Sequence, residues 1–252
     1  MINLSTVDWV VENVETVLFD KDGTIIDLHY FWGKMTELRA EEIIRRYGLK
    51  RKALAEICCS LGYDLNSQKM LADGITALYS RSKIIEIFST DLRKMFGLDV
   101  TSNELATIFD EVSDVFYKNI HEYTKPIPEA IDFVKKLYLK GVSLGIVTSD
   151  SVVSTNMTLE HFGWEGMFKV VVGRESSPET KESGALTRLA LEKINANPET
   201  TVMIGDAPMD YWAAKNAEVD KTILVATGQI GLRDLSKISD YIIKSLSEIN
   251  IV

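Results

Sequence analysis

Hydrophobic positions along the chain first follow the pattern of a buried strand. Residues 14–19 (VETVLF) form a short run rich in β-branched and apolar side chains, and the run ends at Asp20. Such a run predicts a strand covered on both faces, as in a parallel sheet. Chemistry in these sheets lies just beyond the carboxyl ends of the strands, so the residues after Phe19 are the first candidates for a site.

Residues 27–125 have a helical pattern and almost no strand signal. Apolar positions recur near the 3.6-residue period of a helix, and SNEL at 102–105 is a capping signal for a helix N-terminus. The helices expected in this stretch cover 31–47, 52–61, one or two segments within 68–96, and 102–123. The pattern therefore predicts an all-helical insertion after the first strand.

Helices and strands alternate after KPIP at 125–128, where the proline-containing return is the expected hinge. The expected helices cover 129–140, 151–162, 184–194 and 208–216. The expected strands cover 142–147, 169–172, 201–204 and 222–225, with a last edge strand at 241–243. This alternation predicts an α/β fold, a Rossmann-like doubly wound parallel sheet formed by 1–26 and 126–252, into which the helical domain of 27–125 is inserted.

The composition is that of an ordinary globular protein, with 46% hydrophobic and 26% charged residues among 252. The formal net charge of −9 gives no general attraction to nucleic acid, so no nucleic-acid partner is expected. The chain has no export signal and no apolar run long enough to span a membrane, which predicts a cytoplasmic protein without a membrane partner. Cys58 and Cys59 are adjacent, so we interpret them as free thiols.

The sharpest local feature is Asp20-Lys21-Asp22-Gly23-Thr24, directly after the first predicted strand. Two carboxylates at this spacing suit a nucleophile and a general acid, and clustered acids also suit a hard cation such as Mg²⁺. The alternative is a polar turn, for which Asp22-Gly23 is a favourable pair.

Three later residues match this chemistry. Asp206, in the sequence GDAPMD at 205–210, follows a predicted strand and would meet Asp20 if the two strands are neighbours. Thr148 ends another strand and Lys181 precedes a helix, so both suit the binding of phosphate oxygens. The alternatives are helix capping by the aspartates and by Thr148, and an exposed surface position for Lys181.

This order of motifs, a strand with DxDGT, a strand with Thr, a Lys and a strand with GDxxxD, resembles the haloacid dehalogenase-like hydrolase superfamily. Its phosphoglycolate phosphatase-like branch is the most similar. The resemblance implies that 27–125 is a helical cap domain. It also implies a Mg²⁺-dependent phosphatase that hydrolyses a small phosphomonoester, of the phosphoglycolate or sugar-phosphate type, through an aspartyl-phosphate.

The resemblance assigns a role to each matching residue. Asp20 is the expected nucleophile and Asp22 the expected acid and base, while Thr148 and Lys181 hold the phosphoryl oxygens. The implied Mg²⁺ ligands are Asp20, Asp206, Asp210 and the backbone carbonyl of Asp22. The expected substrate-binding residues are Gly23, Thr24 and Ser149, with His29 and Trp32 as hypothetical contacts to the leaving group. Packing of the aromatic residues against the hinge is the alternative for the last two.

Three departures from the family pattern affect these expectations. No proline follows Lys181, Lys21 is an unusual residue between the two aspartates, and Asp150 places a negative charge near the phosphate site. Asp150 would weaken phosphate binding or select a cationic substrate.

Asp22 argues against a dehalogenase, since halide leaves without protonation. A sugar phosphomutase, or a non-catalytic protein that retains the phosphate pocket, stays open as an alternative. The expected partner is a small phosphorylated metabolite, and the expected state is a monomer or a homodimer.

Overall fold

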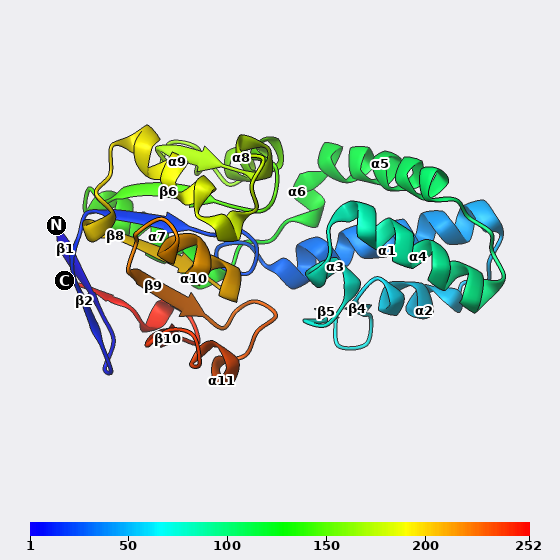
Figure 1. Cartoon of the computed structure of the whole chain (residues 1–252), viewed down its shortest axis with the longest axis horizontal. Coiled ribbons are helices and arrows are strands. Elements are labelled where there is room, and N and C mark those ends of the chain that lie inside the picture. Colours follow the sequence, from blue (N-terminus) through cyan, green and yellow to red (C-terminus); the bar gives the residue numbers. More distant parts are fainter. The chain divides into compact units, whose positions relative to one another are not determined.

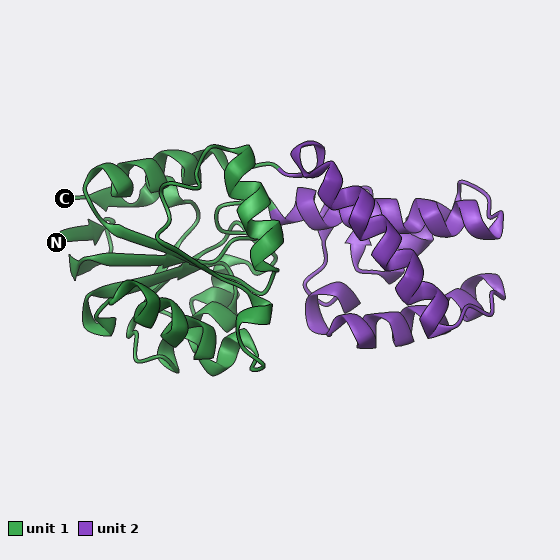
Figure 2. Cartoon of the chain, turned by 90° about the horizontal axis from the view of Figure 1, so that it is seen from above, with its two compact units in different colours: residues 1–27, 125–252 green, residues 28–124 purple.

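A computed structural model describes all 252 residues, which form two compact units (Figure 2). Unit 1 comprises Met1–Asp27 and Lys125–Val252, and unit 2 comprises Leu28–Thr124. Within unit 1, the N–H of Asp27 donates to the carbonyl of Lys125 (2.8 Å), and the N–H of Ile127 donates to that of Ile25 (3.0 Å). The outgoing and returning segments of the chain are therefore tied together where the insertion begins and ends.

Unit 1 contains a six-stranded parallel sheet in the order β10-β9-β8-β3-β6-β7 (Figure 1). Its strands are β3 (Thr16–Phe19), β6 (Ser143–Val147), β7 (Val170–Val172), β8 (Thr201–Gly205), β9 (Lys221–Val225) and β10 (Tyr241–Ile243). The predicted α/β fold is confirmed, and each of these strands begins and ends within two residues of the expected position.

Both faces of the sheet are covered by helices (Figure 2). These helices are α7 (Pro128–Leu139), α8 (Val152–His161), α9 (Ala185–Ile194), α10 (Pro208–Lys215) and the short α11 (Leu232–Leu235). Four 3₁₀ turns are η1 (Arg174–Ser176), η2 (Lys181–Ser183), η3 (Pro198–Thr200) and η4 (Leu246–Glu248). Neighbouring residues of β3 point to opposite faces: Leu18 joins the apolar cluster formed with α9 and α10, and Phe19 packs edge-on against Phe133 of α7.

A second, antiparallel sheet joins the two ends of the chain, and the sequence pattern did not predict it. It has the order β11-β1-β2, with β1 at Ile2–Ser5, β2 at Val10–Val14 and β11 at Asn250–Ile251. The pairing of β1 with β2 shifts register, and Asn13 has a φ of 59°. This irregularity breaks the alternation by which a strand is recognised in a sequence.

Unit 2 is helical except for one hairpin. Its helices are α1 (Leu28–Tyr47), α2 (Ala53–Ser60), α3 (Ile75–Leu78), α4 (Arg81–Phe96), α5 (Ser102–Lys118) and α6 (Ile120–Tyr123). The expectation of an all-helical insertion is wrong at β4 (Tyr63–Asp64) and β5 (Lys69–Met70), which pair antiparallel. Two-residue strands are too short to show a period. The capping box of α5 starts at Thr101, one residue before the expected signal.

Candidate active site

The carboxyl ends of three neighbouring strands carry the predicted site residues. Asp20 follows β3, Thr148 follows β6 and Asp206 follows β8, and β3 lies between the other two strands. The N–H of Asp20 donates to the carbonyl of Ile204 (2.8 Å), and the N–H of Thr148 donates to that of Val172 (3.0 Å). These bonds continue the ladder beyond the strands, so the side chains start from fixed positions along one edge of the sheet.

Three buried carboxylates meet at this edge. One oxygen each from Asp20, Asp206 and Asp210 lies within 4.8 Å of the others. Asp210 is in the first turn of α10, where its Oδ2 accepts from the N–H of Ala207 (3.0 Å). Asp210 therefore caps helix α10, as the alternative interpretation of the sequence proposed, and it also belongs to the acidic cluster.

The electrostatics of the cluster follow from burial and from the repulsion between its members. Burial raises the pKa of Asp206 well above its usual range, and the charge of Asp20 raises it further. Burial also raises the pKa of Asp210 to about 6, although Lys181 opposes the shift. Both groups would lose protons more readily beside an added positive charge.

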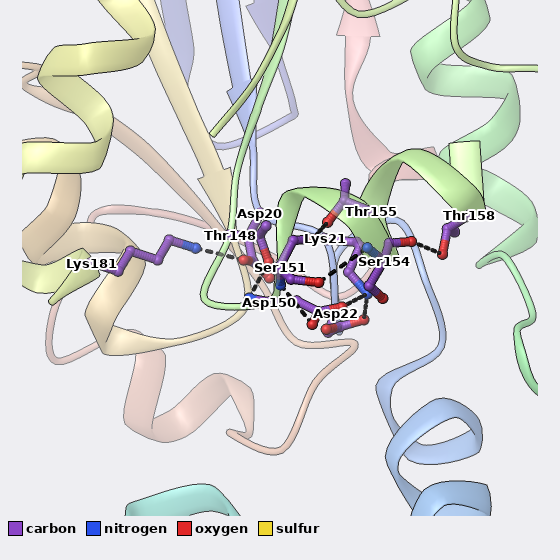
Figure 3. A network of polar contacts seen from close by, with 10 residues as sticks. All are labelled: Asp20, Lys21, Asp22, Thr148, Asp150, Ser151, Ser154, Thr155, Thr158 and Lys181. Atoms are coloured by element: carbon purple, nitrogen blue, oxygen red, sulfur yellow. Dashed lines mark hydrogen bonds and ion pairs between the residues drawn. The ribbon is translucent and has the colours of Figure 1, made fainter. Parts of the chain in front are cut away.

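Lys181 lies inside the site and is not the exposed lysine of the alternative interpretation. Its Nζ is 2.5 Å from Oδ1 of Asp20 and 2.6 Å from Oδ1 of Asp210, and its side chain is 2% exposed. Figure 3 shows it reaching Asp20. Burial alone would lower the pKa of Lys181, but the charges of the two aspartates raise it above the usual value. Lys181 contacts two of the three carboxylates of the cluster and brings a single positive charge, so negative charge remains to be balanced.

Glycine backbones enclose the acidic cluster. A Cβ atom built on Gly23, whose φ is +94°, would lie 2.4 Å from Oδ2 of Asp206. A Cβ on Gly228 would lie 1.7 Å from the same oxygen, and one on Gly205 would lie 2.2 Å from Oδ2 of Asp210. The hydroxyl of Thr227 donates to the carbonyl of Gly23 (2.5 Å). This hydrogen bond ties the loop after β9 to the segment 20–24 after β3, called the motif loop below.

Carboxylate oxygens that lie as close together as those of the acidic cluster are the ligands that a hard divalent cation takes in proteins. The uncompensated negative charge of the cluster also favours the binding of such a cation. The residues present therefore fit a divalent metal. Gly228 and Thr227 were missed by the sequence analysis, and their position just after β9 is the signal that would have indicated them.

Asp22 lies beside the acidic cluster and makes a different contact. Its Oδ1 is 2.6 Å from Nζ of Lys21, and its carboxylate is not part of the acidic cluster formed by the other three aspartates. Burial raises the pKa of Asp22 to about 6, against the charge of Lys21, while Asp150 and Asp20 raise it further. The carbonyl of Lys21 accepts from the N–H groups of Ile25 and Ile26, a turn that folds the motif loop back on itself.

The two smaller polar residues of the site differ in exposure. Thr24 is completely buried, and its hydroxyl makes a long hydrogen bond of 3.5 Å to Oδ1 of Asp206. Ser149 is exposed, and its hydroxyl lies 3.5 Å from Sδ of Met209. Ser149 thus has a surface available to a ligand, whereas the Thr24 side chain faces the acidic cluster.

Asp150 does not present a free charge to the site. Its side chain is fully buried and its Oδ2 is 3.0 Å from Nζ of Lys21. The expectation that Asp150 repels phosphate or selects a cationic substrate lacks support, because the lysine compensates its charge within the protein.

The two cap residues named as hypothetical substrate contacts lie on α1, in unit 2. Nδ1 of His29 accepts from the N–H of Met70 in β5 (3.1 Å). The ring of Trp32 packs edge-on against Phe31, with centroids 5.4 Å apart. Both residues therefore contribute to the packing of unit 2.

The chain is similar to known proteins of one hydrolase family. The family model described as haloacid dehalogenase-like hydrolase matches residues 63–225. A phosphoglycolate phosphatase of Aquifex aeolicus is 27% identical over 240 residues, 94% of this chain and 95% of the relative. A protein named pyrophosphatase PpaX, of Oceanobacillus iheyensis, is 24% identical over 246 residues, 94% of this chain and 95% of the relative. The solved structure of a predicted phosphoglycolate phosphatase from Haemophilus somnus has a TM-score of 0.72 at 16% identity, covers 94% of this chain and 97% of its own, and supports the fold.

The chain belongs to the haloacid dehalogenase-like hydrolase family, whose model matches more than half of its length. It is an enzyme of this hydrolase family, and it resembles the phosphoglycolate phosphatase-like branch. None of its helices combines the length and the apolar composition needed to cross a membrane.

Proposed function

We propose that the protein is a Mg²⁺-dependent phosphatase that hydrolyses a small phosphomonoester through an aspartyl-phosphate. The observation that carries the proposal is the meeting of Asp20, Asp206 and Asp210 around Lys181, with Asp22 beside them, at one edge of the sheet. A nucleophile, a positive charge and oxygen ligands for a cation are the groups that phosphoryl transfer requires.

The roles follow from the position of each side chain. A carboxylate oxygen of Asp20 attacks phosphorus, and Asp22 gives a proton to the leaving oxygen and later takes one from water. The pKa of Asp22, raised to about 6, suits both transfers near neutral pH. The Thr148 hydroxyl accepts from the N–H of Asp150 (3.0 Å), so its own proton is available to a phosphoryl oxygen.

The cation site comprises carboxylates of Asp20, Asp206 and Asp210 and the backbone carbonyl of Asp22. When bound there, Mg²⁺ supplies charge neutralisation for an anionic substrate. Lys181 adds the positive charge that contacts the phosphoryl oxygens. This arrangement lets a protein of net charge −9 take an anionic substrate.

Substrate choice is assigned to unit 2 as a cap and to nearby residues of the core. The proposed substrate contacts are Gly23, Ser149, His29 and Trp32. Thr24, expected among them from the sequence, is completely buried and faces the acidic cluster instead. The proposed substrate class is a small phosphorylated metabolite, of the phosphoglycolate or sugar-phosphate type. The names of the relatives add inorganic pyrophosphate as a second candidate.

The test is phosphate release from a panel of phosphoglycolate, sugar phosphates, nucleoside monophosphates, amino-alcohol phosphates, p-nitrophenyl phosphate and pyrophosphate, each with Mg²⁺ or with a chelator. Asp20→Asn should abolish turnover without unfolding the protein, whereas Asp240→Asn, on an exposed aspartate, should be active. Normal turnover by Asp20→Asn would refute the proposed nucleophile. A rearranged sugar phosphate without free phosphate would indicate a mutase, and ligand binding without turnover would indicate a non-catalytic protein.

A further inference from the structure

Lys21 is a completely buried lysine that joins two loops of the active site. Its Nζ is 2.6 Å from Oδ1 of Asp22 and 3.0 Å from Oδ2 of Asp150 (Figure 3). Lys21 and Asp22 follow β3, and Asp150 lies beyond the end of the neighbouring strand β6. Two residues that each depart from the family pattern therefore meet as a buried ion pair.

Asp150 is itself held firmly by the backbone around it. Its Oδ1 accepts from the N–H of Ser151 (2.7 Å), and its own N–H donates to the hydroxyl of Thr148 (3.0 Å). Its carbonyl accepts from the N–H of Arg174 (3.0 Å). Asp150 is thus a fixed anchor for the lysine, connected to the residue that is proposed to bind phosphate.

We propose that Lys21 and Asp150 act as a pair of positioning residues that hold the carboxylate of Asp22 in the orientation needed for proton transfer. Lys21 engages Oδ1 of Asp22, which leaves Oδ2 for the leaving oxygen. Asp150 holds the lysine in place and balances its buried charge. This inference rests on the proposed function, since it concerns the acid and base of that reaction.

Lys21 and Asp150 carry opposite charges that balance each other inside the protein. We therefore expect that neither residue can position Asp22 without the other. A buried lysine without Asp150 has only Asp22 to balance its charge, and Asp150 without the lysine is a buried charge without an opposite partner. Removal of one member of a buried ion pair is costly, whereas replacement of both by neutral side chains is often tolerated. The double variant Lys21→Met with Asp150→Asn therefore separates positioning from folding.

The leaving group of the substrate distinguishes positioning of Asp22 from a general defect. An alkoxide is a poor leaving group and needs the proton from Asp22, whereas p-nitrophenolate leaves with little help. The probes are p-nitrophenyl phosphate and the alkyl phosphate of the panel that the wild type hydrolyses fastest. Variants are Lys21→Met, Asp150→Asn, the double variant, and Lys244→Met as a matched control on an exposed lysine of unit 1.

We expect Lys21→Met and the double variant to lose at least about tenfold more in kcat/KM on the alkyl ester than on the aryl ester, since general acid–base catalysis is worth about 10² to 10⁴ in rate. The readout is kcat/KM because it reports the step in which the leaving group departs, whereas hydrolysis of the aspartyl-phosphate is common to both esters. Asp150→Asn should change the same ratio in the same direction, and Lys244→Met should leave it unchanged. Thermal unfolding of each variant reports folding separately.

Equal losses on both esters, or a wild-type ratio in a folded double variant, would overturn the inference and leave the proposed function standing. Absence of turnover by the wild type on every ester would instead refute the proposed function, and the inference would fall with it. If Lys21→Met does not fold, the double variant decides the question, because it contains no unpaired buried charge from this pair.

Discussion

Replacing Gly228 by alanine would place a methyl group where the carboxylate of Asp206 lies. The added Cβ would be 1.7 Å from Oδ2 of Asp206 and 2.5 Å from its Cγ. The loop after β9 is held against the motif loop by the hydrogen bond from Thr227 to Gly23 (2.5 Å), so it resists moving away. The aspartate side chain is therefore the part that must shift.

The size of the effect follows from that distance. Real Cβ contacts stay beyond 3.0 Å, so the carboxylate must move by more than about 1 Å, and a displacement of that size in a site can lower the rate about 10²-fold. Such a loss corresponds to about 2.7 kcal/mol of transition-state stabilisation. Asp206 is one of the three proposed cation ligands, so the concentration of Mg²⁺ for half-maximal activity should also rise.

The assay is kcat/KM for phosphate release as a function of Mg²⁺ concentration, with unfolding measured in parallel. Gly231→Ala is the matched control: it lies in the same loop, its φ is −80°, and no atom lies within 4 Å of an added Cβ. The control should behave as the wild type does. If Gly228→Ala retained wild-type kcat/KM and the wild-type Mg²⁺ requirement, the reasoning from the Asp206 contact would be wrong.

Three further predictions concern the metal, the sheet and the thiols. A chelator should stop phosphate release and added Mg²⁺ should restore it, and Asp206→Asn should raise the Mg²⁺ requirement by about tenfold or more in the same titration. Gly145→Ala should lower the free energy of unfolding in denaturant by about 1 to 3 kcal/mol, because its Cβ would come within 2.8 Å of side chains on both adjacent strands; Gly166→Ala, with open space, should not. Cys59 should react with Ellman's reagent in the native protein, because it is exposed. Cys58 should react only after unfolding, since burial raises the pKa of its thiol to about 12. Rapid reaction of both thiols in the native protein would contradict this prediction.

Much of the fold could be predicted from the sequence because its signals are local. The apolar run before Asp20 is contained in one strand, and each helix and strand after 125–128 is recognised by the hydrophobic pattern within that element. The structure confirms the parallel sheet that these patterns predict. The hairpin of β4 and β5 and the terminal sheet with β11 could not be predicted, because strands of two to five residues with a register shift or a positive φ carry no readable period.

The candidate site was predicted in part for the same reason. Asp20 and Asp206 were named from motifs at strand ends and Lys181 from its position before a helix, and the structure brings them together. Gly228 was missed although it follows a predicted strand, because only the tertiary packing places this loop glycine against Asp206. The partner of Asp150 could not be predicted, because the ion pair with Lys21 forms only when β3 and β6 lie side by side.

The sequence by itself determined which residues are candidates for the chemistry and which strand or helix each stands beside, since both depend on neighbours along the chain. Only the tertiary structure decided which charges meet: that Lys181 faces two aspartates, and that Lys21 neutralises Asp150. The physical reason is that electrostatic energy depends on distance and burial in space. Lys21 and Asp150 are separated by 129 positions in the sequence, and their charged atoms come within 3.0 Å only when β3 and β6 pair.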